Sequence, residues 1–248
     1  LMSGTTREEV LAAVGSDRAV PVTEHLDAMP ADYLRSTPIG DVLWHLDLIA
    51  SRDDLPRVDV RRGTPLETAV VVGEDSSSFR RHVAESFAAN GIDVLEARLH
   101  TRADGLVVDS FQVRDDRTGE EVGDERWGRA RHDIEAAASG QLDPVSKMEA
   151  RASAYQSQTS SGRKPIVECS IDSATGDVVV IVKCSDRIGR LAEILAAISA
   201  CGLEVRLAKL DSRGDELVDT FHVRGGRDDV DAERIAGWAQ LIAAGITP

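Results

Sequence analysis

A short loop in the last third of the chain has residue types that suit the binding of a zwitterion. Residues 185–189 read Ser-Asp-Arg-Ile-Gly and run directly into a segment with helical spacing of apolar residues. Backbone N–H groups and the dipole at a helix N-terminus favour a carboxylate or phosphate. Gly189 allows close approach because it has no Cβ, and Asp186 could accept a hydrogen bond from an ammonium group. The loop predicts an amino-acid site, with a simple helix cap as the alternative.

Outside this loop, the sequence offers no pattern typical of catalysis. It contains no GxxxxGK[ST], GxGxxG, GxSxG, HExxH or CxxC motif, and its six histidines are scattered singly. Asp109 and Asp219 occupy equivalent places, each two residues before a phenylalanine. For these two carboxylates we favour a hydrogen bond to a neighbouring loop over a catalytic role. We therefore expect no catalytic residues, no metal site and no cofactor.

The composition excludes several classes of partner. Apolar residues make up 42% of the 248 residues, charged residues 29%, and the formal net charge is −14. Nucleic acids and anionic membranes attract basic surfaces, so neither is an expected partner. No apolar run approaches the length that spans a bilayer. Three cysteines form no CxxC pair, which is typical of a reducing compartment. These features predict a cytoplasmic protein.

An internal repeat is the strongest pattern in the chain. Residues 91–102 match residues 202–213 in chemical type at nearly every position, with an offset of 111 residues. The match continues between residues 108–114 and 218–224. Upstream, Asp75 precedes the first glycine of its copy by the same distance as Asp186 precedes the second. The chain therefore contains two copies of one structural unit.

Each copy predicts the element order β-β-α-β-β-α. Continuous β-branched runs and alternating apolar residues predict strands at 57–61, 68–73, 92–102, 106–114, 166–171, 178–184, 203–213 and 217–223. Helical spacing predicts helices at about 76–90, 121–139, 191–201 and 228–244. A ferredoxin-like unit has the order β-α-β-β-α-β. We therefore expect an α+β protein of two circularly permuted ferredoxin-like units, in which the first two strands of each copy form a hairpin.

The domain organisation follows from the same patterns. Residues 1–54 predict a helical segment that packs on a neighbouring domain. The first unit then spans 55–140 and the second 166–248, with 141–165 between them. Because the intervening stretch is rich in Ser, Ala and Gln, we expect at least part of it to be a linker.

Several runs resemble the ACT domain. They are residues 186–191, 202–205 and 218–223. The doubled arrangement is similar to the tandem ACT pair that ends the bifunctional PII-protein uridylyltransferase/uridylyl-removing enzyme family. Residues 29–34 and Trp44-His45 resemble the segment that joins the catalytic part of those enzymes to the pair. The catalytic motifs of the family are missing, so the resemblance implies a fragment or a free-standing sensor.

The resemblance implies a regulatory function. ACT domains pair their sheets and bind small molecules, usually amino acids, at the shared interface, and in this family the implied effector is glutamine. The loop positions fall on Asp186, Arg187, Ile188 and Gly189, and on Asp75 in the first copy. The start of the second strand falls on Leu203 and Glu204, and on Asp93 in the first copy. Ile188 stands in place of the usual proline, and Glu204 and Asp93 stand where an amide is common.

Three functions stay open at this point. The first is a sensor that binds glutamine or a related amino acid between the copies and relays nitrogen status to a protein partner. The second is a ligand-free module for protein interaction or for homodimerisation through the sheets. The third, least favoured, is an enzyme of unrecognised type, which would need a clustered acid and base that the sequence does not show.

Overall fold

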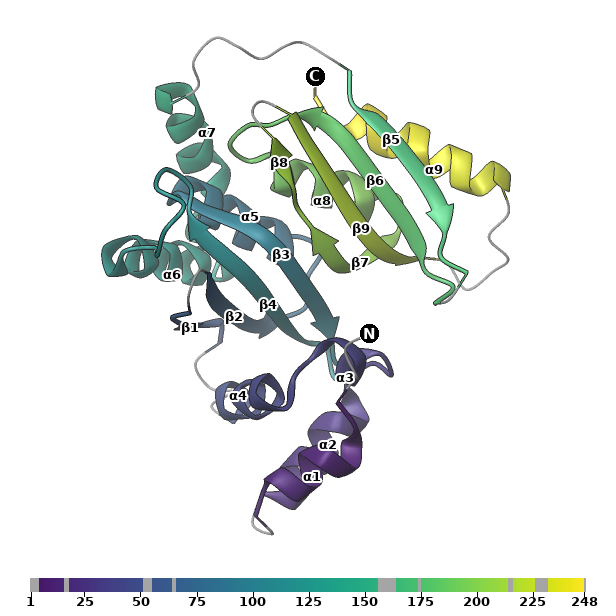
Figure 1. Cartoon of the computed structure of the whole chain (residues 1–248). Coiled ribbons are helices and arrows are strands. Elements are labelled where there is room, and N and C mark those ends of the chain that lie inside the picture. The colour runs from purple at the N-terminus through teal and green to yellow at the C-terminus, as the bar shows by residue number, and fades with distance from the viewer. Residues whose placement is uncertain are drawn as a thin grey trace.

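One antiparallel sheet runs through the whole molecule. The computed structural model describes residues 5–15, 18–50, 55–63, 66–155, 164–173, 175–213, 216–225 and 232–247. Its strands lie in the order β1-β2-β4-β3-β7-β9-β6-β5, and a short strand, β8, also pairs with β9. Figure 1 shows the two halves of this sheet side by side. The fold is therefore α+β and consists of two ferredoxin-like units.

The first unit contains the strands β1 (Arg57–Arg61), β2 (Glu67–Glu74), β3 (Ile92–Thr101) and β4 (Leu106–Asp115). The second contains β5 (Ile166–Ile171), β6 (Val178–Ser185), β7 (Leu203–Lys209), β8 (Ser212–Arg213) and β9 (Glu216–Gly225). The expected hairpins are confirmed, because β1 pairs with β2 and β5 pairs with β6, both antiparallel. Circular permutation itself stays a prediction. The expected tip of the last hairpin, at 214–215, lies outside the described residues.

One face of the sheet carries the helices that bury the main core. They are α5 (Phe79–Ala89), α6 (Asp124–Ala138), α8 (Arg190–Ala200) and α9 (Ala232–Gly245). Phe87, Phe111 and Trp127 form edge-to-face aromatic contacts in the first unit. Phe221 and Ile242 are fully buried in the second. A single apolar cluster continues from one unit into the other.

The N-terminal helices cover the opposite face of the first unit. They are α1 (Arg7–Ala13), α2 (Ala19–Ala28), α3 (Tyr33–Ser36) and α4 (Ile39–Ile49). The expected packing on a neighbouring domain is confirmed, since Val70, Val72 and Val108 of the sheet share a core with these helices. A buried polar chain crosses this contact: Tyr33 Oη lies 2.7 Å from His45 Nδ1, and His45 Nε2 lies 3.0 Å from Ser110 Oγ.

The two units join edge to edge through equivalent strands. β3 pairs antiparallel with β7, and Ala97 lies opposite Ala208. These alanines hold the same position in the repeat, so a local pseudo-twofold axis passes between them. Each has at most 3% of its surface exposed, which lets α5 and α8 pack together over the junction. The units are therefore paired within one chain.

The segment between the units differs in part from its expected form. Pro144–Tyr155 forms a helix, α7, which packs against α5. These residues are helical and packed, and a linker over part of 141–165 stays a prediction. Tertiary packing explains the helix, because Lys147 pairs with buried Asp133 at 2.5 Å and Arg151 donates to the Ala88 carbonyl at 2.9 Å. Residues 156–163 of the predicted linker lie outside the described part of the chain.

The structure bears on two features considered in the sequence, membrane-spanning segments and cysteines. No helix within the described ranges is long and apolar enough to cross a membrane. Cys169, Cys184 and Cys201 are free thiols. Burial raises the pKa of Cys169 and of Cys184 to about 11, so neither is a reactive thiolate at neutral pH.

Candidate functional site

Two pockets lie between the units and are related by the pseudo-twofold axis. The Asp186 pocket combines the loop of the second unit, residues 186–189, with the start of β3 in the first unit, residues 92–94, in a volume of about 690 Å³. The Asp75 pocket combines residues 75–77 of the first unit with residues 203–205 of the second, in about 760 Å³. Both volumes are in the range of small-molecule sites. Each pocket takes its loop from one copy and its strand from the other.

The predicted site residues therefore divide into two groups. Asp186, Arg187, Ile188, Gly189 and Asp93 line the Asp186 pocket. Asp75, Leu203 and Glu204 line the Asp75 pocket. The loop and the strand position of one copy never share a pocket, because the edge-to-edge pairing places each loop opposite the strand of the other copy.

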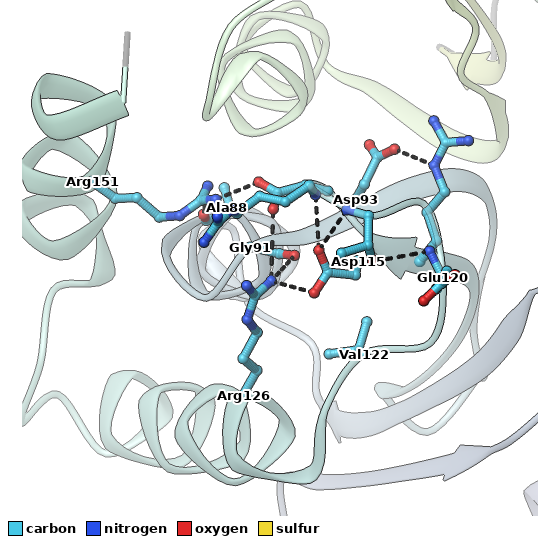
Figure 2. Close-up of polar contacts among 12 residues, drawn as sticks. Ala88, Gly91, Asp93, Asp115, Glu120, Val122, Arg126 and Arg151 are labelled. Atoms are coloured by element: carbon cyan, nitrogen blue, oxygen red, sulfur yellow. Dashed lines mark hydrogen bonds and ion pairs between the residues drawn. The ribbon is translucent and has the colours of Figure 1, made fainter.

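The β3 wall of the Asp186 pocket is held by hydrogen bonds from the neighbouring helices. Arg126 donates to the Gly91 carbonyl at 3.2 Å, and Arg151 donates to the Ala88 carbonyl at 2.9 Å (Figure 2). Asp115 accepts at 2.7 Å from Arg126 and anchors the adjacent turn. Figure 2 shows the Asp93 side chain pointing away from Asp115. These bonds fix the backbone at the end of α5 and at the start of β3.

Four arginines and four aspartates line the Asp186 pocket, but the arginines do not pair with all of the aspartates. Its four arginines all bond to carboxylates: Arg114 to Asp93 at 2.8 Å, Arg151 to Asp116, and Arg187 and Arg190 to Glu193 at 2.8 Å. Two further carboxylates line the pocket, Asp186 and Asp219. Across the described residues, neither forms an ion pair. Asp219 is 3% exposed and accepts one backbone hydrogen bond, from Asp211 N at 3.3 Å.

Burial without an arginine partner raises the proton affinity of Asp219. Burial, together with the negative charges of Asp186 and Asp93, raises the pKa of Asp219 to about 7. Burial likewise raises the pKa of Asp93, although Arg114 opposes that shift. A carboxyl group in a cleft with a pKa near 7 is typical of a binding or catalytic site. A bound cation would stabilise the ionised form.

The Asp75 pocket has a built-in cation at the corresponding place. Asp109, the equivalent of Asp219, accepts from Arg80 Nε at 2.9 Å and from Arg80 Nη2 at 3.1 Å. Arg80 is the second residue of α5, and the second residue of α8 is Leu191. Leucine therefore replaces arginine in the second copy. The Asp186 pocket therefore has the carboxylate of Asp219 without the arginine that binds its counterpart, Asp109.

Gly189 has a role that the sequence analysis did not predict. It precedes α8 with φ +86°, and a Cβ there would lie 2.5 Å from Met148 Sδ of α7. The close approach expected for a ligand is therefore made by a protein side chain. Gly189 is required by the backbone conformation and by packing, so its substitution is a test of the fold before it is a test of binding.

Sequence reasoning missed several residues of the Asp186 pocket. Arg114, Arg151 and Arg190 are among its lining residues, and only folding brings them there. Asp219 was assigned a structural role, and it does accept a hydrogen bond from a neighbouring turn as expected. Alignment of the two copies carries a sign of this second role, because Arg80 in the first copy aligns with Leu191 in the second, which leaves Asp219 without an arginine.

Comparison with known proteins supports the resemblance. No family model matches the chain. It is 29% identical over 184 residues to a bifunctional uridylyltransferase/uridylyl-removing enzyme of Gluconobacter oxydans, covering 71% of this chain. An enzyme of the same name from Thiobacillus denitrificans is 28% identical over 89% of this chain, and one from Phenylobacterium zucineum is 28% identical over 95% of it. The chain thus resembles part of the bifunctional uridylyltransferase/uridylyl-removing enzymes.

The matched region is a small part of these relatives. It spans 19% of the Gluconobacter protein and 26% of the other two. The relatives are named as enzymes, but the alignment covers about a quarter of their length or less.

Proposed function

We propose that the chain is a non-catalytic regulatory module that binds an amino acid, with glutamine favoured, in the Asp186 pocket. The observation that carries this proposal is the pair of carboxylates, Asp186 and Asp219, which line an interface pocket and form no ion pair among the described residues. The similarity to part of the uridylyltransferases supports a regulatory region of such an enzyme, or a separate chain that acts on one.

The ammonium group of the ligand binds where the first copy has its arginine. In the Asp75 pocket, Arg80 supplies positive charge to Asp109. In the Asp186 pocket Leu191 leaves that place to the ligand, and Asp186 and Asp219 receive the ammonium. A charge-assisted hydrogen bond of this kind contributes about 1.5–3 kcal/mol.

The carboxylate of the ligand binds at the start of α8. By the geometry of a helix, the N–H groups of Leu191 and Ala192 have no acceptor within the helix, and both residues line the pocket. The positive end of the helix dipole lies at the same place. A free α-amino acid satisfies both halves of the site, whereas a simple cation or a simple anion satisfies only one.

The experiment is a thermal-shift panel of the twenty amino acids on the full chain, followed by calorimetry of each hit. Asp186→Asn should reduce affinity about 10–100-fold, from the loss of one charge-assisted bond. Asp75→Asn is the matched control at the equivalent loop position in the other pocket, and it should leave affinity unchanged.

Two results would overturn the proposal. If no amino acid stabilises the chain at millimolar concentration, the second function, a ligand-free interaction module, takes its place. If Asp75→Asn weakens binding and Asp186→Asn does not, the ligand occupies the other pocket, and the argument from unpaired carboxylates is wrong.

A further inference from the structure

Three further polar side chains, which line neither interface pocket, come together where α5 meets α7. His82 and Glu85 are three residues apart on α5, and Asp143 immediately precedes α7. One ligand atom from each of the three residues lies within 4.8 Å of the others. The equivalent positions in the second copy are Glu193 and Ala196, so the repeat does not reproduce this cluster.

Glu85 lacks the partners that a buried carboxylate requires. The residue is 2% exposed, and its Oε1 accepts from Arg81 Nη1 at 2.8 Å. Its Oε2 is buried and has no hydrogen-bond partner in the described structure. Leaving a charged oxygen unsatisfied inside a protein is costly, so such an atom calls for an explanation such as an ion.

We propose that His82, Glu85 and Asp143 bind a divalent transition-metal ion of the zinc, manganese or cobalt class. One imidazole and two carboxylates suit these ions, whereas magnesium and calcium favour oxygen ligands alone. The cluster is partly open, since Asp143 is exposed, and water can complete the coordination. The group contains no thiol, the ligand that copper(I) favours.

Arg81 is the group that competes with the ion. Its Nη2 lies 3.2 Å from His82 Nε2, and its side chain is 35% exposed. The guanidinium can therefore turn into solvent when an ion takes the imidazole and the carboxylate. The ion would then tie α7 to α5, and α7 supplies Met148 and Arg151 to the region of the Asp186 pocket.

The test is calorimetric titration of the chelator-treated full chain with Zn²⁺, and with Mg²⁺ in parallel. We expect one equivalent of Zn²⁺ to bind, and His82→Ala and Glu85→Gln each to weaken binding by at least about tenfold. Arg81→Ala should tighten it, because the competing positive charge is gone. His132→Ala, at an exposed histidine on α6, should bind like the unmodified chain.

The outcomes separate the ion site from a plain salt bridge. If Zn²⁺ does not bind, or binds equally to His82→Ala, the proposal is wrong and Glu85 serves only as the partner of Arg81. Co²⁺ binding followed by visible absorption checks the ligands independently, because loss of the imidazole changes the spectrum. The Glu85 and His82 variants report on the same ion, so a folding defect in one leaves the other decisive.

Discussion

Replacing Leu191 with arginine should convert the Asp186 pocket into a copy of the Asp75 pocket. Leu191 holds the helix position that Arg80 holds in the first unit. There, Arg80 contacts both oxygens of Asp109, at 2.9 and 3.1 Å. In the Leu191→Arg variant, the new guanidinium should pair with Asp219 and take the place of the ligand's ammonium group.

The expected magnitude follows from the interaction that is lost. Amino-acid affinity should fall about 10–100-fold, since the ammonium can no longer make a charge-assisted bond of about 1.5–3 kcal/mol. The pKa of Asp219, about 7 in the unmodified chain, should fall at the same time. Calorimetry with L-glutamine measures the affinity, and NMR titration of the Asp219 carboxyl carbon measures the pKa.

A neutral variant supplies the control. Leu191→Met keeps an apolar side chain of similar volume in the same place without charge, and it should bind the amino acid normally. The reasoning is refuted if Leu191→Arg binds as tightly as the unmodified chain, or if the methionine variant loses the same affinity.

Three further predictions follow from particular contacts. Amino-acid affinity should rise between pH 6 and 8, by up to about tenfold for each pH unit below the Asp219 pKa of about 7, because ammonium binding requires the ionised carboxylate. Calorimetry in buffers of different ionisation enthalpy should detect the released proton, and an affinity that does not change with pH would contradict this prediction. Burial lowers the pKa of His25 to about 4 and those of His45 and His100 to about 3. The contribution of these neutral histidines to stability is therefore present above pH 6.5 and is lost as the pH falls toward these pKa values. Urea unfolding should show a free energy of unfolding that decreases from pH 7 to pH 5, and His45→Gln should reduce that dependence on pH. Gly189→Ala should destabilise the chain by about 1–3 kcal/mol more than Gly202→Ala, because both glycines have positive φ but only Gly189 faces Met148. Equal destabilisation of the two variants in thermal unfolding would contradict the prediction that Met148 packs tightly on Gly189.

Local patterns predicted the elements of both units well. The predicted strands at 57–61 and 166–171 have those bounds in the structure and pair with their successors. Gly202 follows α8 with φ +71°, as a glycine after a helix should. These features depend on neighbouring residues, and so the sequence carries them directly.

Long-range features were less accessible. The exchange of loops between the pockets depends on β3 pairing with β7, and no local pattern specifies that pairing. Helix α7 was read as part of a linker because its composition is polar, yet its packing on α5 stabilises it. The chain from Tyr33 through His45 to Ser110 joins residues far apart in sequence, so scattered histidines gave no sign of it.

The central claim is that the Asp186 pocket recognises the ammonium group of an amino acid through unpaired carboxylates. The most direct measurement is calorimetric titration of the full chain with L-glutamine and, separately, with glutaramate, which has the same carboxylate and amide but no α-ammonium group. The account predicts saturable binding of L-glutamine and at least about tenfold weaker binding of glutaramate. Equal affinity for the two compounds, or no binding of either, would contradict it.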